Sequence, residues 1–458
     1  MHSIALTCRA LYQIFQSAAI QYICELDLGF MEDAGSGRPP AELLETLRDR
    51  RKAWGELNWK SVEIVKVDTV LSAYELVAGA FAQTDGSIFS VFWLPSATRE
   101  GSYSATSLGF SIRDFIIDVA QDLVIFFHEE ELPSGSRRAS LHCRTISTNE
   151  THPACSSVDD MYFEVHQHPD YGNIILYLEL EVAADVLFVS VRQEPAAALR
   201  VLIWNWKMGL RSLYVVRRDV FILTSTADSG KILVYQINPT GTSIPVLIAT
   251  LFLPPTRGHR HALTIRAHSG QFQERPTPGA LFMPSPTLRT HVFSFSYSFY
   301  PGRNKSYTMF VGSSTFLRYI DSGCEALEVP WREWGEQESR FMEKRIEGHW
   351  LRYAHGNRIV CKSFNKRGID VLDFTPSPSF KPTRSASGSQ VQQYFSRDDP
   401  TVISKEASTF KGDVVTRLPY RTASREVAKT PFAYMIDEER IIGLELGTAA
   451  VELTVYSF

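Results

Sequence analysis

The feature that most constrains this fold is a change in hydrophobic period near residue 62. Before that point apolar residues recur at helical spacing. After it, short apolar runs such as 76–81, 88–94 and 123–127 alternate with Gly, Pro, Asp and Ser almost to the end of the chain. Runs of this length, without competing helical stretches, predict a body made of β-strands. The 458 residues would fit about three domains, but a repeating β unit accommodates them in one.

A recurring hairpin indicates how this body is built. Asp or Glu-Arg precedes an apolar strand, a polar turn follows, and the second strand ends in hydrophobic or aromatic residues. The matching pairs of segments are 122–126 with 141–146, 185–191 with 201–206, 219–223 with 232–237, and 439–444 with 451–456. They resemble the inner-to-middle hairpins of WD-repeat-like blades, and we therefore expect a mainly β, WD-repeat-like β-propeller. A sandwich or another multi-sheet fold with ordinary hairpins is the alternative.

A helical segment, residues 1–60, is expected to precede the propeller-like body of residues 61–458. Its first helix is predicted between Ile4 and Tyr22, and its second over about 41–57, with Pro40 in the first turn. Leu43, Leu44, Leu47 and Trp54 would form the apolar face of the second helix. Within the body, the polar stretch 375–408 predicts a disordered surface insertion.

Composition excludes several classes of protein. With 44% hydrophobic residues the chain has material for a core, and a net charge of −4 makes nucleic acid a poor partner. We expect the six scattered cysteines to be reduced thiols. The sequence shows neither a signal peptide nor a membrane-spanning segment, so we expect neither export from the cell nor binding to a membrane. The predicted location is cytoplasmic or nuclear.

No catalytic signature with firm geometry is present, and we expect no enzyme, metal or cofactor. The His166/His168 and His259/His261 pairs are interpreted as exposed loops rather than metal ligands, and the acids 129–131 as a solvated loop. Two tryptophan pairs remain. Trp204 and Trp206 are predicted to pack in the core, whereas the Trp331/Trp334 loop is a candidate partner-binding surface, with core packing as its alternative.

Several motifs in order resemble those of the F-box-type proteins of mushroom-forming fungi. Residues 6–12 are similar to the closing helix of an F-box, and 48–59 to the helix that leads into the β body. The motifs that follow in the expected order are 94–99, 113–118, 120–124, 144–149, 204–207, 331–335 and 438–444.

This resemblance implies a non-catalytic scaffold that acts as the substrate-recognition subunit of an SCF-type (cullin) ubiquitin ligase. Leu6, Leu11 and Phe15 would contact the adaptor subunit, and the β body would present a protein target of unknown identity. Met1 falls within the last third of the family's F-box. We therefore also consider a stand-alone propeller module that has lost adaptor binding, in which those three side chains pack against the body. A propeller hydrolase or lectin-like enzyme is a third, disfavoured hypothesis.

Overall fold

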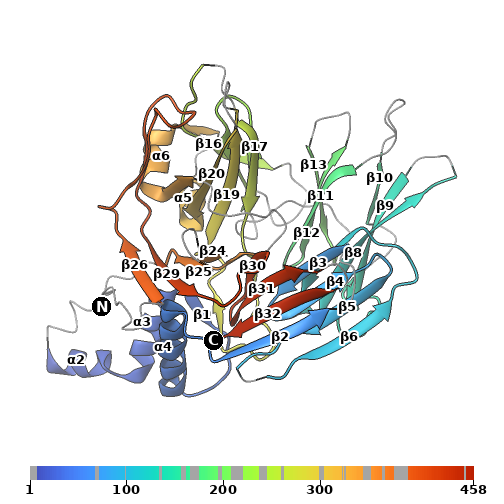
Figure 1. The fold of residues 1–458 in the computed structure, drawn as a ribbon, viewed down its shortest axis with the longest axis horizontal. Coiled ribbons are helices and arrows are strands. Elements are labelled where there is room, and N and C mark those ends of the chain that lie inside the picture. The colour runs from blue at the N-terminus through green and yellow to red at the C-terminus, as the bar shows by residue number, and fades with distance from the viewer. Residues whose placement is uncertain are drawn as a thin grey trace.

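The protein is mainly β, with 50% of residues in strands and 16% in helices, and its sheets form a β-propeller arrangement (Figure 1). The predicted fold class is therefore confirmed. The computed structural model describes residues 8–67, 72–97, 99–133, 137–155, 161–165, 175–193, 199–207, 220–236, 245–258, 262–298, 304–321, 323, 326–343, 352–363, 367–375, 390–447 and 450–458.

Most sheets are built from strands that follow one another along the chain. The first three, in hydrogen-bonding order, are β3 (Ala73–Val77), β4 (Ala80–Thr84), β5 (Ile88–Trp93) and β6 (Ser102–Ser107); β7 (Asp114–Asp118), β8 (Leu123–Glu131), β9 (Arg137–Thr145) and β10 (Tyr162–Val165); and β11 (Ile175–Ala183), β12 (Val186–Gln193) and β13 (Leu199–Asn205). The next three are β14 (Val220–Ser225), β15 (Lys231–Gln236), β16 (Val246–Phe252) and β21 (Leu327–Val329); β17 (Ala262–His268), β19 (Thr290–Tyr297), β20 (Lys305–Gly312) and β22 (Ser339–Glu343); and β23 (Ala354–His355), β24 (Arg358–Lys362), β25 (Gly368–Asp373), β29 (Tyr420–Glu426) and β26 (Gln390–Phe395).

The last of the larger sheets joins the two ends of the body. Its order is β2 (Ser61–Val67), β32 (Val451–Ser457), β31 (Arg440–Leu446) and β30 (Ala433–Ile436). Antiparallel pairing aligns Ser61 with Ser457 and Val67 with Val451. An early strand thus completes a sheet made from the last three strands, which closes the ring and leaves fewer unpaired edges.

The first strand of a sheet packs beside the first strand of its neighbour. β3 contacts β7, β7 contacts β11, and β14 contacts β17, while β23 and β24 lie against β30. These strands consequently form the inner edge of the arrangement. Two short ladders complete the fold, namely β1 (Met31–Asp33) with β18 (Phe282–Pro284) and β27 (Thr401–Ile403) with β28 (Val414–Thr416).

The four predicted hairpins all pair as expected, as β8–β9, β12–β13, β14–β15 and β31–β32. Three of them, however, join the second and third strands of a sheet; only β14–β15 joins the first two. The predicted inner-to-middle position was wrong for these three. The Asp of the pattern belongs to the turn that precedes the second strand, as Asp122 does with its left-handed φ of 53°.

The predicted first helix is divided in two. α2 (Arg9–Phe15) and α3 (Ala18–Gly29) meet at Ser17, whose extended ψ of 143° interrupts the helical path. The second prediction is confirmed: α4 (Pro40–Glu56) buries Leu43, Leu44, Leu47 and Trp54. No helix among the described ranges is both long and apolar enough to cross a membrane.

Residues 390–408 are not the disordered insertion that the composition predicts. Residues 376–389 lie outside the described ranges, but the chain then forms β26 and β27. The fully buried guanidinium of Arg340 holds the connecting segment by donating to the carbonyl oxygens of Asp399 at 2.8 Å and Ser396 at 3.3 Å. A polar segment can be ordered in this way because a buried Arg supplies hydrogen bonds in place of an apolar core.

Candidate functional site

The Trp331/Trp334 pair does not form a binding surface. Both residues lie on α6 (Trp331–Glu338), which follows α5 (Ser313–Asp321) and β21 between β20 and β22. Trp334 is fully buried and donates from Nε1 to the carbonyl oxygen of Phe252 at 3.0 Å, and Trp331 is 7% exposed. The candidate partner surface was therefore wrong, since the periodicity of a short helix turns both rings inward.

Other sequence predictions have mixed outcomes. Trp204 and Trp206 are buried in the core as predicted. The acids 129–131 lie on β8 and not in a loop; Glu129 pairs with Arg113 at 2.7 Å and Arg137 at 3.4 Å. His166, His168, His259 and His261 lie outside the described residues. Of the cysteines in the described ranges, none forms a disulfide, and Cys143 and Cys361 are buried.

The N-terminal candidates lie on an exposed helix. Leu6 is outside the described residues, Leu11 is 38% exposed and Phe15 is half-buried. With Ile14, which is 57% exposed, Leu11 and Phe15 share one face of α2 at helical spacing; we call these three residues the α2 stripe. No residue of α2 is buried, and Figure 1 shows the helix projecting beyond α3 and α4.

In contrast to α2, helices α3 and α4 are fastened to the propeller. Tyr22 on α3 donates to Asp33 Oδ2 at 2.9 Å and packs with the buried face of α4 against Phe282. At the other end of α4, Trp54 stacks on Phe458 with ring centroids 3.9 Å apart. The helical lead therefore holds a fixed orientation relative to the sheets, and α2 extends from a rigid support.

A pocket of about 730 Å³ opens where the inner-edge turns converge beside α4; we call it the axial pocket. The turns β3–β4, β7–β8 and β30–β31 contribute to it, as do α4 and the segment that leads to β18. Its lining residues are Arg50, Ala78, Trp93, Arg99, Glu100, Ser102, Val119, Asp122, Gln273, Thr277, Pro278, Gly279, Ala280, Phe282, Met283, Pro284, His355, Asp437, Glu438, Glu439 and Arg440. Its size is typical of a ligand pocket.

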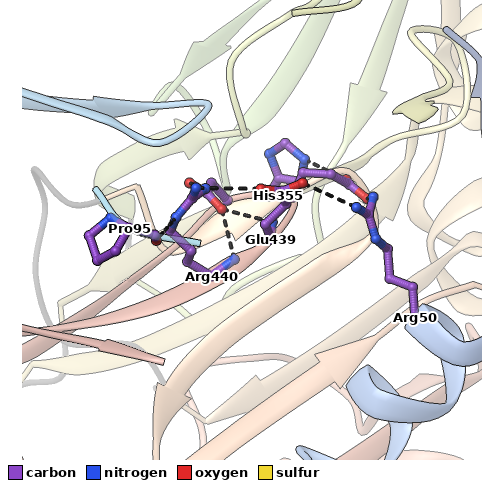
Figure 2. Close-up of polar contacts among 7 residues, drawn as sticks. Arg50, Pro95, His355, Glu439 and Arg440 are labelled. Carbon is purple, nitrogen blue, oxygen red and sulfur yellow. Dashed lines mark hydrogen bonds and ion pairs between the residues drawn. The ribbon is translucent and has the colours of Figure 1, made fainter. Parts of the chain in front are cut away.

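An ion-pair network forms one wall of the axial pocket (Figure 2). Arg50 of α4 donates to Glu438 at 3.4 Å and to Glu439 at 3.1 Å. His355 lies 3.0 Å from Glu438 Oε2 through its Nε2. Burial by itself raises the pKa of the Glu438 carboxyl, but the His355 hydrogen bond and the nearby Arg50 charge outweigh burial and lower it.

Arg440 extends the network toward the neighbouring sheet. Its side chain is 1% exposed and pairs with the equally buried Asp437 at 3.2 Å and with Glu439 at 3.4 Å. Nε donates to the carbonyl oxygen of Pro95. Close to the guanidinium, Gly79 has a φ of +82°, and a Cβ there would lie 2.9 Å from Arg440 Nη1. Glycine is required at this turn both for its backbone conformation and for the approach of Arg440.

A second void, of only about 10 Å³, adjoins the axial pocket and is bordered by Gln271, Gln273 and Arg352. Arg352 makes a bidentate ion pair with Glu75 of β3, at 2.6 Å and 2.7 Å. Burial raises the pKa of Asp114, on the adjacent inner strand β7, to about 6. The ion pair between Arg352 and Glu75 thus lies beside this small void.

The described part of the chain contains no group of three or more His, Cys, Asp or Glu residues placed to hold a metal ion. Sequence reasoning missed the axial pocket entirely. In the sequence, Arg50 is recognisable only as a basic residue near the end of a helix, and residues 439–440 only as the start of a hairpin. The one available signal was the acidic triplet 437–439 directly before an apolar strand, which places charge at an inner turn.

No protein-family model and no curated protein matches this chain. Among solved structures, it is similar at a TM-score of 0.33 to the polysaccharide lyase Uly1, with 9% identity, covering 85% of this chain and 90% of that one. It is also similar at a TM-score of 0.29 to an uncharacterized protein from Listeria monocytogenes EGD-e, with 10% identity, covering 70% of this chain and 100% of that one. Neither likeness is close enough to carry a functional argument.

Proposed function

We propose that this chain is a non-catalytic protein-interaction scaffold that serves as the substrate-recognition subunit of an SCF-type ubiquitin ligase. In this role the α2 stripe binds the adaptor subunit, and the propeller presents a protein target. The β-propeller fold suggests an interaction module. The observation that carries the finer proposal is the α2 stripe itself, which leaves Leu11 and Ile14 exposed on a helix with no buried residue.

The attachment of the helical segment to the propeller supports this proposal. Arg50 pairs with Glu438 and Glu439 on the β30–β31 turn, and Arg425 lies over the ring of Trp59 with its Cζ 3.6 Å from the centroid. These contacts prevent α4 from swinging relative to the sheets. An adaptor bound to α2 would consequently hold a target on the propeller at a defined distance from the ligase. In this proposal the chain works in the cytoplasm or nucleus, and ubiquitin chemistry belongs to other subunits.

The alternative is a stand-alone propeller module without adaptor binding. It is favoured by the small size of the α2 stripe, because stable interfaces bury roughly 800 Å² on each partner and three side chains offer only part of this. The α3–α4 faces that could enlarge the stripe are already used, since Tyr22, Leu43 and Leu47 pack against Phe282.

A pull-down with purified adaptor tests the proposal. The wild-type chain should bind, and a Leu11→Asp/Ile14→Asp double variant should lose binding while it keeps its melting temperature, because both side chains are exposed. Gln13→Asp places one such negative charge on exposed α2 away from the stripe and should leave binding intact. Failure of the wild-type chain to bind would overturn the ligase role. Deleting all residues before Glu32 is a poorer test, because it removes Tyr22 and Met31 from their packing.

A further inference from the structure

The axial pocket carries an excess of negative charge. Five carboxylates line it, from Glu100, Asp122, Asp437, Glu438 and Glu439, against three arginines, which leaves two negative charges when His355 is neutral. In a cavity with protein walls such an excess is focused, because the surrounding protein screens charge less than water does. The pocket therefore favours a cation over an anion or a neutral ligand.

Two of the three arginines in the lining are held by carboxylates, and the third, Arg99, is exposed next to Glu100 at the rim. Arg50 is engaged by Glu438 and Glu439, and Arg440 by Asp437 and Glu439. The carboxylates outside this network differ. Asp122 accepts hydrogen bonds from the Ser147 backbone N–H at 2.9 Å and from the Ser147 hydroxyl but is paired with no described cation, and Glu100 is exposed at the rim. Two carboxylates thus remain for a positively charged group.

An aromatic side chain completes the set. Trp93, at the end of β5, is half-buried in the pocket lining and also packs against the core cluster that contains Phe89 and Phe115. The other ring of the lining, Phe282, is already covered by Arg50, whose Cζ lies 5.4 Å from the ring centroid. The lining thus combines an indole with the carboxylates of Glu100 and Asp122, the kinds of group that bind ammonium and guanidinium ions.

We propose that the axial pocket binds a lysine- or arginine-bearing peptide segment of a partner protein. The apolar stem of the basic side chain packs against Trp93 and Pro278, and its charged head meets Asp122 and Glu100. The volume of about 730 Å³ accommodates several residues of an extended segment. This inference deepens the proposed function, on which it rests, by naming the chemistry of the target that the propeller presents.

The test uses the full chain without adaptor, so that its outcome is separate from that of the pull-down. A fluorescent peptide of alternating lysine and glycine should bind, measured by anisotropy, with an affinity that falls as salt is raised. The matched glutamate–glycine peptide should not bind. The Leu11→Asp/Ile14→Asp variant should bind the lysine peptide as the wild type does.

Two sets of variants locate the binding. Glu100→Gln/Asp122→Asn should weaken it about tenfold, whereas Glu63→Gln, on the exposed face of the outer strand β2, should not change it. At the exposed rim position Ser102, Ser102→Lys should weaken binding and Ser102→Glu should strengthen it. Equal binding of the acidic peptide, or unchanged binding in all pocket variants, would overturn the proposal. If spermidine bound more tightly than the peptide, the cationic ligand of the pocket would be a small polyamine and not a peptide, which would overturn the proposal.

Discussion

Arg440 donates from Nε to the carbonyl oxygen of Pro95 at 2.6 Å, although 345 positions separate the two residues. Arg440 begins β31 in the closing sheet, and Pro95 follows β5 in the neighbouring sheet. A single buried guanidinium therefore fastens the last sheet of the ring to the first.

Arg440→Met should lower the free energy of unfolding by about 3 kcal/mol, because the buried Asp437 carboxylate loses its counter-charge. Urea denaturation measures the change. Arg99→Met removes an exposed arginine and should shift the free energy by less than about 0.5 kcal/mol. Equal stability of the two variants would show that Arg440 does not fasten the sheets.

The stacked pair Trp54–Phe458 should show energetic coupling. Trp54→Leu and Phe458→Leu each remove one ring of the pair, whose ring centroids lie 3.9 Å apart and whose ring planes are inclined by 12°. A double-mutant cycle on unfolding free energies should give a coupling of about 1 kcal/mol. Trp54→Leu combined with Phe163→Leu, which lies in a different core cluster, should be additive. Additivity in the first cycle would contradict the stacking.

Asp114 should make stability fall as pH rises. Burial raises the pKa of Asp114 to about 6, and the neighbouring Glu75 charge adds to the rise. Because this value exceeds the ordinary pKa of Asp, the stability that the group contributes is fully present below about pH 4 and is lost as pH rises through about 6.

Asp114→Asn removes this titration and should stabilise the protein by about 2 kcal/mol at pH 8 but not at pH 4. Urea midpoints across this range measure the difference. Asp85 is the control of opposite sign: hydrogen bonds from the backbone of Ile88 and Ser87 lower its pKa. Asp85→Asn should therefore cost stability near neutral pH and not in acid, and a parallel response of the two variants would contradict both assignments.

Arg340 should control the order of residues 396–418. Its guanidinium donates to the carbonyl oxygens of Leu418 at 2.8 Å and Asp399 at 2.8 Å, at either end of the β27–β28 ladder. Arg340→Met should accelerate amide hydrogen exchange in this segment and speed trypsin cleavage after the already exposed Lys405, while exchange in β31 stays slow. Arg332→Met, on the exposed side of α6, should leave the exchange pattern unchanged. An unaltered segment in Arg340→Met would refute the assignment.

The sheet architecture was accessible from sequence because it depends on local pattern. The apolar run 123–127 and its partner 141–146 lie where β8 and β9 pair, since alternation and turn residues determine a hairpin without reference to the rest of the chain. The order of strands within a sheet depends on contacts between distant residues. For this reason the sequence pattern predicts the strand position of three hairpins wrongly, one strand too close to the inner edge.

The candidate site was not accessible in the same way. Trp331 and Trp334 drew attention because exposed aromatic pairs bind partners, but a helix of eight residues turns both into the core. Conversely, Arg50, His355 and Glu438 come together only when α4, β23 and the β30–β31 turn meet at the axis. Separations of this length leave no periodic signal, so a folded structure is needed to reveal the pocket.

The pairing of β2 with β32 sets a condition on biosynthesis. During translation Ser61 leaves the ribosome long before Ser457, its partner across the ladder, has been made. Until then β2 has an unpaired edge and Val67, fully buried in the closed sheet, is uncovered, and such a strand is prone to misassociation. Closure therefore has to wait until residues 451–457 have been made, after the strands of the other sheets.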